Sequence, residues 1–214
     1  SNPAAVAVPP GAFEDAVAYS QTTGAAIVHD FAYGDLVFDG RSPQSFLATA
    51  GAKDVGVEMF SMSKSYGMAG WRVGFVVGNA EIVSRLDLLA DHMRVGIFTP
   101  VQHAGIAALT GPQDSVAERV ATYQRRRDRV REVLPHITSE GSFYLWWELP
   151  DGLTPERLLE HRLGPVARRR RGLLVVRLFL GDESRDRVAD ERAPVLEIST
   201  GDLLALGVRR QPPF

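Results

Sequence analysis

The chain has no cysteine among its 214 residues, and only two of its 24 basic residues, Lys53 and Lys64, are lysines. The absence of cysteine excludes disulfides, iron–sulfur clusters and thiol catalysis from this sequence. No apolar run reaches the roughly 18 residues that a membrane-spanning helix needs, and no secretory signal pattern opens the chain. We therefore expect a protein of the cytosol.

Strong charge of either sign is also missing. A formal net charge of -2 gives no reason to expect a nucleic-acid partner or an acidic membrane surface. A hydrophobic content of 45% with 23% charged residues is typical of a soluble globular protein, and the length favours one domain or little more. No Gly-x-Gly-x-x-Gly motif follows an apolar run, so a dinucleotide-binding site is not indicated.

Short apolar runs alternate with longer periodic segments, which is typical of an α/β fold with a mainly parallel sheet. Ser115-Val-Ala-Glu118 is a capping-box pattern and predicts the start of a long helix. The charged run 124–129 predicts a solvated face of that helix, with an anion site as the alternative. We expect strands at 25–30, 55–60, 72–78, 141–149 and 172–176, and helices at about 80–94 and 101–110 and from 154.

Lys64 lies in the segment Phe60-Ser-Met-Ser-Lys-Ser-Tyr-Gly-Met-Ala-Gly-Trp-Arg-Val-Gly74, between two expected strands. Its amine can form an imine with an aldehyde. The hydroxyls of Ser61 and Ser63 and the guanidinium of Arg72 can donate hydrogen bonds to a phosphate, although a surface salt bridge is an alternative for Arg72. Pyridoxal 5′-phosphate (PLP) carries both an aldehyde and a phosphate, so the segment predicts PLP as the cofactor; no metal site is predicted.

Three further polar residues suit the same cofactor. Asp30 ends an expected strand, where open α/β sheets place ligands, and its carboxylate can pair with a protonated pyridine nitrogen. Tyr33 follows within one turn and can donate to the phenolic oxygen, as can the amide of Asn2. The alternatives are a turn aspartate, a half-buried tyrosine and a simple Asn-Pro turn.

The order and spacing of Asn2-Pro3, Asp30-x-x-Tyr33 and the Ser61–Gly74 segment resemble the class I and II aminotransferases, PLP enzymes of fold type I. Segments 29–40, 51–58 and 96–102 are most similar to the bacterial alanine (glutamate–pyruvate) and LL-diaminopimelate aminotransferases. The resemblance covers about residues 1–150. It implies that residues 1–112 form the C-terminal part of the PLP-binding large domain and that residues 113–214 form a connecting helix and a small α+β domain.

The resemblance also implies an activity. Lys64 would form the Schiff base with PLP and shuttle a proton while an amino group moves from an amino acid to a 2-oxo acid in a ping-pong reaction. Alanine or glutamate, with pyruvate or 2-oxoglutarate, are the expected substrates. The expected assembly is a homodimer in which Thr99 approaches the neighbouring site. The implied cofactor-binding residues are Asn2, Asp30, Tyr33, Ser61, Ser63, Lys64 and Arg72, and the implied substrate-binding residues are Asn2 and Arg187.

Two departures from the family pattern keep alternatives open. Family chains are nearly twice as long, and the missing part would precede Asn2, so we expect a fragment or a partner chain that supplies the rest. Arg187 is the nearest match to the arginine that binds the substrate carboxylate, but Arg185, Arg192 and a plain surface role compete with it. A PLP-dependent lyase or cyclase, or an inactive truncated fragment that only dimerises, are the alternative functions.

Overall fold

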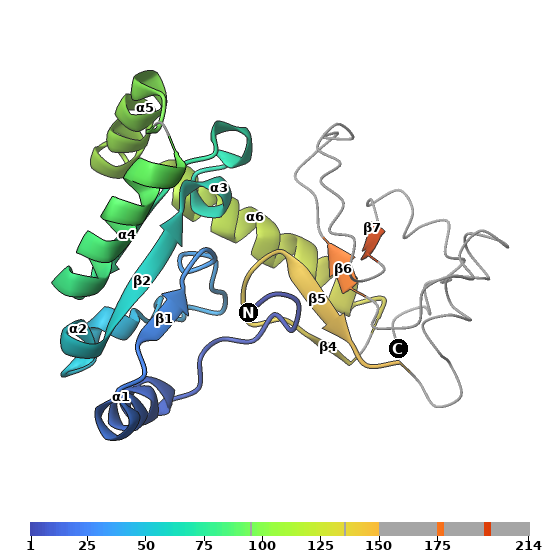
Figure 1. Ribbon diagram of the computed structural model, residues 1–214. Coiled ribbons are helices and arrows are strands. Elements are labelled where there is room, and N and C mark those ends of the chain that lie inside the picture. Colours follow the sequence, from blue (N-terminus) through green and yellow to red (C-terminus); the bar gives the residue numbers. More distant parts are fainter. Residues whose placement is uncertain (95, 135, 150–174, 178–194, 198–214) are drawn as a thin grey trace, which may run out of the picture. The chain divides into compact units, whose positions relative to one another are not determined.

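The computed structural model describes residues 1–94, 96–134, 136–149, 175–177 and 195–197 (Figure 1). The predicted helix from 154 and the three candidate carboxylate-binding arginines lie outside the described residues. The chain forms two compact units. The large unit is Ala7–Ala121, and the terminal unit contains Ser1–Val6 and the described residues from Thr122 on. The domain boundary expected between residues 112 and 113 stays a prediction.

The sheet of the large unit has three strands in the order β1-β2-β3, with bounds Ile27–Asp30, Gly56–Ser61 and Gly74–Gly78. β1 and β2 are parallel, as expected, and β3 is antiparallel to β2. Asp30 therefore pairs with Met59 at the carboxyl edge of the parallel strands, and Ser61 pairs with Gly74 at the same end of the antiparallel ladder. All three strands agree with the sequence prediction to within two residues.

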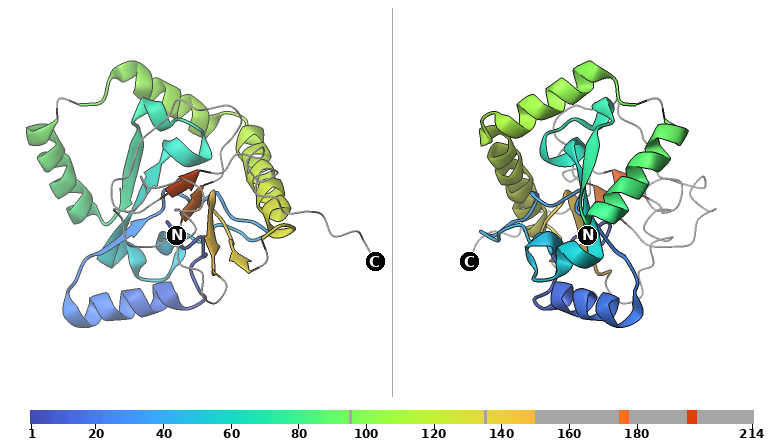
Figure 2. Two further views of the ribbon diagram at one scale, coloured as in Figure 1. Left: turned by 90° about the vertical axis from the view of Figure 1, so that its right-hand side faces the viewer. Right: turned by 60° about the vertical axis from the view of Figure 1, so that its left-hand side comes forward.

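This sheet is contacted by α1, η1, α2 and α4, and α4 lies beside β2 and β3 (Figure 1, Figure 2). None of the described helices is long and apolar enough to cross a membrane. The helices expected at about 80–94 and 101–110 are present as α4 and α5, and the capping-box helix is α6. The helical segments are α1 (Ala12–Thr23), η1 (Phe46–Ala48), α2 (Ala52–Val55), α3 (Met62–Ser65), η2 (Ala69–Trp71), α4 (Ala80–Met93), α5 (Thr99–Thr110) and α6 (Asp114–Arg131).

One face of the sheet is covered by α1, η1 and α2. The core there is formed by Val17, Phe46 and Ala52, which are almost completely buried. Burial of an apolar side chain of the size of valine or phenylalanine contributes about 1.5 to 3 kcal/mol, so this cluster fixes the covered face. Along β1, Ile27 and His29 are half-buried while Val28 and Asp30 are exposed. The alternation of a strand thus places Asp30 on the face opposite the core.

The terminal unit contains a four-stranded sheet in the order β4-β5-β6-β7, with bounds Ile137–Thr138, Tyr144–Trp147, Val175–Arg177 and Val195–Glu197. β4, β5 and β6 pair antiparallel, and β6 pairs parallel with β7. The strand expected at 141–149 is present as β5. The strand expected at 172–176 overlaps β6, which begins three residues later.

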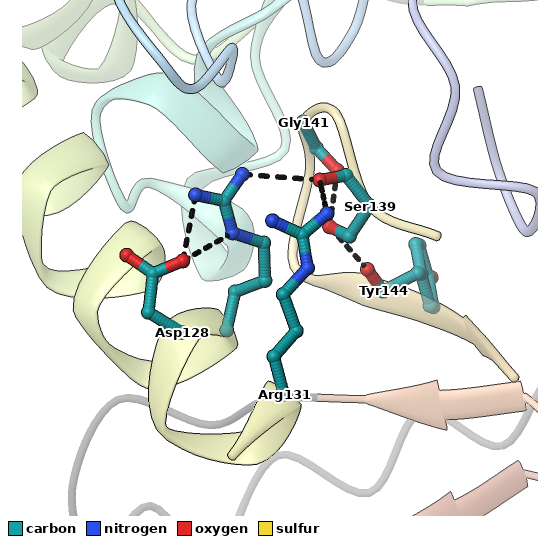
Figure 3. A network of polar contacts seen from close by, with 6 residues as sticks. Asp128, Arg131, Ser139, Gly141 and Tyr144 are labelled. Carbon is teal, nitrogen blue, oxygen red and sulfur yellow. Dashed lines mark hydrogen bonds and ion pairs between the residues drawn. The ribbon is translucent and has the colours of Figure 1, made fainter. Parts of the chain in front are cut away.

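The arginine run of α6 contains a buried side chain, so its interpretation as a solvated face is wrong at Arg127, which is 1% exposed. The guanidinium donates from Nη1 to the carbonyl oxygen of Ser139 at 3.1 Å and from Nε to Oδ1 of Asp128 at 2.8 Å. Figure 3 shows that Arg131 reaches the same Ser139 carbonyl, and that the Ser139 hydroxyl donates to the carbonyl of Tyr144. Arg127 therefore ties α6 to the turn between β4 and β5.

Candidate cofactor site

Ser61 both ends β2 and caps α3. Its backbone is extended, with φ -119° and ψ 128°, and its Oγ accepts a hydrogen bond from the backbone N–H of Ser63 at 3.2 Å. A serine in this position satisfies an amide that the helix itself leaves unpaired. The cap makes the chain turn at the edge of the sheet, so that Ser63 and Lys64 follow directly after the strand.

Arg72 begins the return to β3 in a left-handed conformation, with φ 54° and ψ 49°. Its exposed side chain donates from Nη1 to the carbonyl oxygen of Ala69 at 3.2 Å. Close approach of the two strands follows at Gly74, where an added Cβ would lie 2.5 Å from the carbonyl oxygen of Phe60. Glycine at this position therefore lets β3 start beside Ser61, and Arg72 is held at the same end of the ladder.

Ser61, Ser63 and Arg72, the three residues predicted to bind the phosphate, line one hollow. Its volume is about 520 Å³, and Gly74 also lines it. A second guanidinium, that of Arg94 at the end of α4, lines the same hollow and was not predicted, because a single arginine after a helix carries no pattern. Hydroxyls and guanidinium groups are the donors that bind phosphate in proteins, so this donor set fits the phosphate of PLP. The remaining lining residues that lie on α4 or just after it are Leu86, Leu89, Ala90, Met93 and Ile97.

Lys64 and Tyr33 lie close together. The Lys64 Nζ is 5.7 Å from the centroid of the Tyr33 ring, although 31 positions of sequence separate the two residues. Tyr33 is half-buried in the irregular segment after β1, and Asp30 ends that strand with an exposed side chain. One carboxylate oxygen of Asp30 accepts from the N–H of Ala32 at 3.1 Å, which is the aspartate turn considered above. The carboxylate of Asp30, the phenol of Tyr33 and the amine of Lys64 thus all follow the carboxyl ends of β1 and β2, within the large unit.

Two of the predicted residues are not joined to this group. Asn2 is exposed and belongs to the terminal unit, so its contact with the cofactor stays a prediction. Arg187 lies outside the described residues, and its contact with the substrate stays a prediction as well.

The structure adds residues that hold the end of α3. The Tyr66 hydroxyl donates to Oε1 of Gln113 at 2.9 Å; burial raises the pKa of this phenol, and the charge of Asp35 raises it further. Arg119 donates from Nε to the carbonyl oxygen of Ser65 at 3.2 Å. Its guanidinium lies above Gly67, where φ is 67° and an added Cβ would meet Nη2 at 2.7 Å. These contacts come from α6 and the turn before it, so the local motif gave no sign of them.

Comparison with known proteins identifies the family. The model of the class I and II aminotransferases matches residues 1–177. The L-glutamine–4-(methylsulfanyl)-2-oxobutanoate aminotransferase of Bacillus subtilis (strain 168) is 44% identical over 162 residues, which are 73% of this chain and 41% of that protein. The glutamate-pyruvate aminotransferase of Escherichia coli (strain K12) is 42% identical over 156 residues, which are 71% of this chain and 38% of that protein.

Solved structures agree with these matches. An aminotransferase from Staphylococcus aureus superposes with a TM-score of 0.71 and 35% sequence identity, over 78% of this chain and 46% of that one. The chain thus spans about two fifths of the length of the curated relatives it matches, because the matched residues are 41% and 38% of the two proteins named above. Because the family model matches residues 1–177 of 214, the chain belongs to the class I and II aminotransferases, a family of PLP-dependent enzymes of fold type I.

Proposed function

We propose that the protein containing this chain is a PLP-dependent aminotransferase that moves an amino group between an amino acid and a 2-oxo acid. The observation that carries the proposal is the position of the Lys64 Nζ, 5.7 Å from the Tyr33 ring centroid, together with a hollow lined by Ser63, which precedes Lys64, and by Ser61 and Arg72. PLP, when bound, supplies an aldehyde that bonds to amines and a ring that withdraws electrons from the substrate's α-carbon.

Each residue of the chain has a proposed part in this chemistry. Ser61, Ser63 and Arg72 hold the phosphate by hydrogen bonds. Lys64 supplies the amine for covalent attachment and, once displaced by substrate, carries the proton to and from the α-carbon. Asp30 accepts a hydrogen bond from the ring nitrogen and keeps that nitrogen protonated.

The remaining proposed contacts concern the phenolic oxygen of the cofactor and the substrate. Tyr33 donates to that oxygen from its place beside Lys64, and Asn2 donates to the same oxygen and contacts the substrate. Arg187 binds the α-carboxylate of the substrate, because a guanidinium pairs with a carboxylate through two parallel hydrogen bonds.

Alanine or glutamate as donor, and pyruvate or 2-oxoglutarate as acceptor, are the proposed substrates. One of the two relatives above is named for glutamate and pyruvate, and the other for glutamine and a 2-oxo acid with a thioether. Both names describe an amino acid paired with a 2-oxo acid, which supports the reaction type more strongly than the individual substrate.

A homodimer in the cytosol is the proposed working form, with residues 1–112 in the large domain and 113–214 as connecting helix and small domain. Large apolar side chains are exposed on α4 and before α5: Leu88 is 61%, Met93 73% and Phe98 73% exposed. Exposed apolar side chains in one region support a protein–protein contact there. Thr99 begins α5 in this region, where the family resemblance places the approach to the neighbouring site. Sedimentation analysis of the purified protein tests the dimer.

The cytosolic location is proposed because amino acids and 2-oxo acids are metabolites of that compartment.

Covalent fixation of PLP tests the proposed chemistry. The protein is incubated with PLP, reduced with borohydride and mapped by mass spectrometry of its peptides. We expect one pyridoxyl group on the Lys64 peptide of the wild type and of Lys53→Ala, and none on Lys64→Ala. Lys53 is the matched control because it is the other lysine of the sequence and is exposed. Labelling of Lys53 instead of Lys64 would refute the proposed site.

Product analysis then separates transamination from elimination. We expect the 2-oxo acid of the donor to form in a one-to-one ratio with the amino acid made from the acceptor, without release of ammonia. Ammonia in stoichiometric amounts would instead identify a lyase on the same scaffold.

A further inference from the structure

Glu58 is a buried carboxylate in the middle of β2, with 5% of its surface exposed. Its Oε1 accepts hydrogen bonds from the backbone N–H of Phe46 at 2.8 Å and from Nδ1 of His29 at 2.8 Å. Its Oε2 accepts from the hydroxyl of Ser45 at 2.7 Å. For Nδ1 to donate, the His29 imidazole must carry a proton on that nitrogen. We call these four residues the Glu58 cluster.

The partners of Glu58 stand at the two ends of one loop. His29 precedes Asp30 and the loop 31–44, and Ser45 with Phe46 follows it. The loop carries Tyr33, the residue beside Lys64. One carboxylate on the central strand therefore binds both the entry to the loop and its exit.

The loop has little regular structure of its own. Residues 31–44 contain no helix and only one isolated bridge. Its internal backbone hydrogen bonds are short-range, such as those from Gly34 N–H to the Phe31 carbonyl at 3.0 Å and from Leu36 N–H to the Tyr33 carbonyl at 2.9 Å. Bonds of this kind define local turns but do not fix the loop to the sheet. The entry of the loop is fixed to β2 by the β1–β2 ladder and by the hydrogen bond from the Phe31 N–H to the Met59 carbonyl at 2.9 Å. Attachment of its exit, and burial of Leu36 and Phe38, must fix the rest.

Glu58 itself lies on the face of the sheet opposite the proposed chemistry. Its partner His29 packs edge-on against Phe13, with ring centroids 4.8 Å apart, on the side of α1 and η1. Asp30, the next residue of β1, points to the other face. A direct contact between Glu58 and a cofactor near Asp30 is thereby excluded, so any influence of Glu58 on the site acts through the loop.

We propose that Glu58 is a positioning residue that fixes the exit of loop 31–44 to β2, supports its entry through His29, and so helps to hold Tyr33 beside Lys64. The part of this inference that concerns the cofactor rests on the proposed function, whereas the fixing of the loop does not. Loss of the carboxylate leaves the buried N–H of Phe46, the Ser45 hydroxyl and the His29 Nδ1–H without their acceptor, and unpaired buried donors are strongly unfavourable. The exit of the loop at Ser45 and Phe46 then separates from β2, while the β1–β2 ladder keeps the entry in place, and the loop that carries Tyr33 becomes more mobile.

Three variants of the protein test the proposal. Glu58→Ala removes the acceptor. Glu58→Gln keeps one oxygen for Phe46 and His29 and offers an N–H to the Ser45 hydroxyl, which can turn to accept it. Val57→Ala is the matched control: Val57 is 1% exposed on the same strand and its side chain has no hydrogen-bond acceptor, so its truncation destabilises the sheet without removing a partner of Ser45 or Phe46.

Two measurements are made on each variant. The first is amide hydrogen exchange of residues 31–46 without PLP. The second is the affinity for PLP together with the pH titration of its absorption at Lys64. For Glu58→Ala we expect exchange in the loop to be about tenfold faster, PLP to bind about tenfold more weakly, and the midpoint of the titration to move, since a tenfold ratio corresponds to losing about 1.4 kcal/mol. We expect Glu58→Gln to keep the loop exchange rate and the PLP affinity within about threefold of the wild type, because it retains the hydrogen bonds. The midpoint of the titration should then stay at its wild-type pH. Val57→Ala should leave the loop exchange, the PLP affinity and the titration midpoint as in the wild type, although thermal unfolding should show a lower melting temperature.

The outcomes separate this inference from the proposed function. Unchanged loop exchange in Glu58→Ala overturns the positioning role. Faster exchange with an unchanged PLP affinity and titration midpoint overturns the link to Tyr33 and leaves a purely structural loop attachment. If the wild type fails to attach PLP at Lys64, the proposed function is wrong, while the exchange experiment still decides whether Glu58 fixes the loop.

Discussion

Replacement of Arg72 by glycine should make the protein more stable than replacement by alanine, while both variants lose affinity for PLP. Arg72 adopts a left-handed backbone with φ 54° and ψ 49°. Residues with a Cβ pay roughly 1 to 2 kcal/mol for this conformation, because the Cβ approaches the following carbonyl oxygen. Glycine has no Cβ and avoids this contact. The stabilities of the two variants therefore differ by the conformational energy of the backbone at position 72.

The size of the difference follows from two opposing effects. Glycine removes the left-handed strain of roughly 1 to 2 kcal/mol, but it also raises the entropy of the unfolded chain by an equivalent of about 0.4 to 1 kcal/mol. Both variants lose the same hydrogen bond to the Ala69 carbonyl, and the side chain is exposed, so its other losses cancel. We expect Arg72→Gly to be about 0.5 to 1 kcal/mol more stable than Arg72→Ala.

Urea unfolding of the two variants without cofactor measures this difference, and titration with PLP measures the shared loss. A hydrogen bond to a charged group contributes about 1.5 to 3 kcal/mol, so each variant should bind PLP roughly 10- to 100-fold more weakly than the wild type. An Arg72→Gly protein that is no more stable than Arg72→Ala would show that the backbone is not strained at this position. Equal PLP affinity of wild type and both variants would remove Arg72 from the phosphate site.

Three other perturbations have defined outcomes. Asp30→Ala should lower turnover by several orders of magnitude in steady-state assays while PLP still attaches to Lys64, because the ring nitrogen loses the partner that keeps it protonated; near-normal turnover would contradict the assignment. Arg127→Ala should lower the free energy of unfolding by about 2 to 3 kcal/mol in urea, since the Ser139 carbonyl loses a charged donor, whereas Arg129→Ala, which breaks an exposed ion pair with Glu132, should change it by less than about 1 kcal/mol. Because the pKa of Tyr66 is raised, the folded state keeps the phenol proton at pH values where the unfolded chain begins to lose it. The free energy of unfolding should therefore be constant below about pH 10 and decrease as the pH rises further. Unfolding in urea at rising pH should show a shallower decrease for Tyr66→Phe.

The sequence predicted the strands of the large unit well because β1, β2 and β3 are short apolar runs between glycine or polar residues. It did not predict α1. The sequence Ala12–Thr23 mixes alanine with polar residues and has no clear apolar stripe. Its boundaries are instead set by Gly11 and Gly24, both in left-handed conformations, and Gly24 donates its N–H to the Ser20 carbonyl at 2.7 Å. The glycine at each end of this segment could have indicated the helix boundaries. Such a glycine reflects the backbone conformation at a helix end and not the hydrophobic periodicity of the helix.

The candidate site was predictable to the extent that it is local in sequence. Ser61, Ser63, Lys64 and Arg72 lie in one segment whose residue types already indicate a phosphate and an aldehyde. Glu58 was not recognised, because its importance arises from donors on β1 and η1 that only the folded chain brings together. Arg127 was misassigned for a related reason. A run of charged residues has the same sequence pattern whether one of its guanidinium groups binds a backbone carbonyl in a turn between strands or is surrounded by water.

The pairing of Ser61 with Gly74 has a consequence for how an anion meets this protein. Backbone hydrogen bonds of the β2–β3 ladder join the two ends of the segment that contains Ser63 and Arg72. The donors are thus brought to one hollow by the folding of the chain, before any ligand arrives. Binding a phosphate then requires little further loss of backbone freedom, so the free energy of the new hydrogen bonds is available for affinity. Inorganic phosphate alone should therefore compete with PLP for the protein, without the rest of the cofactor to organise the site.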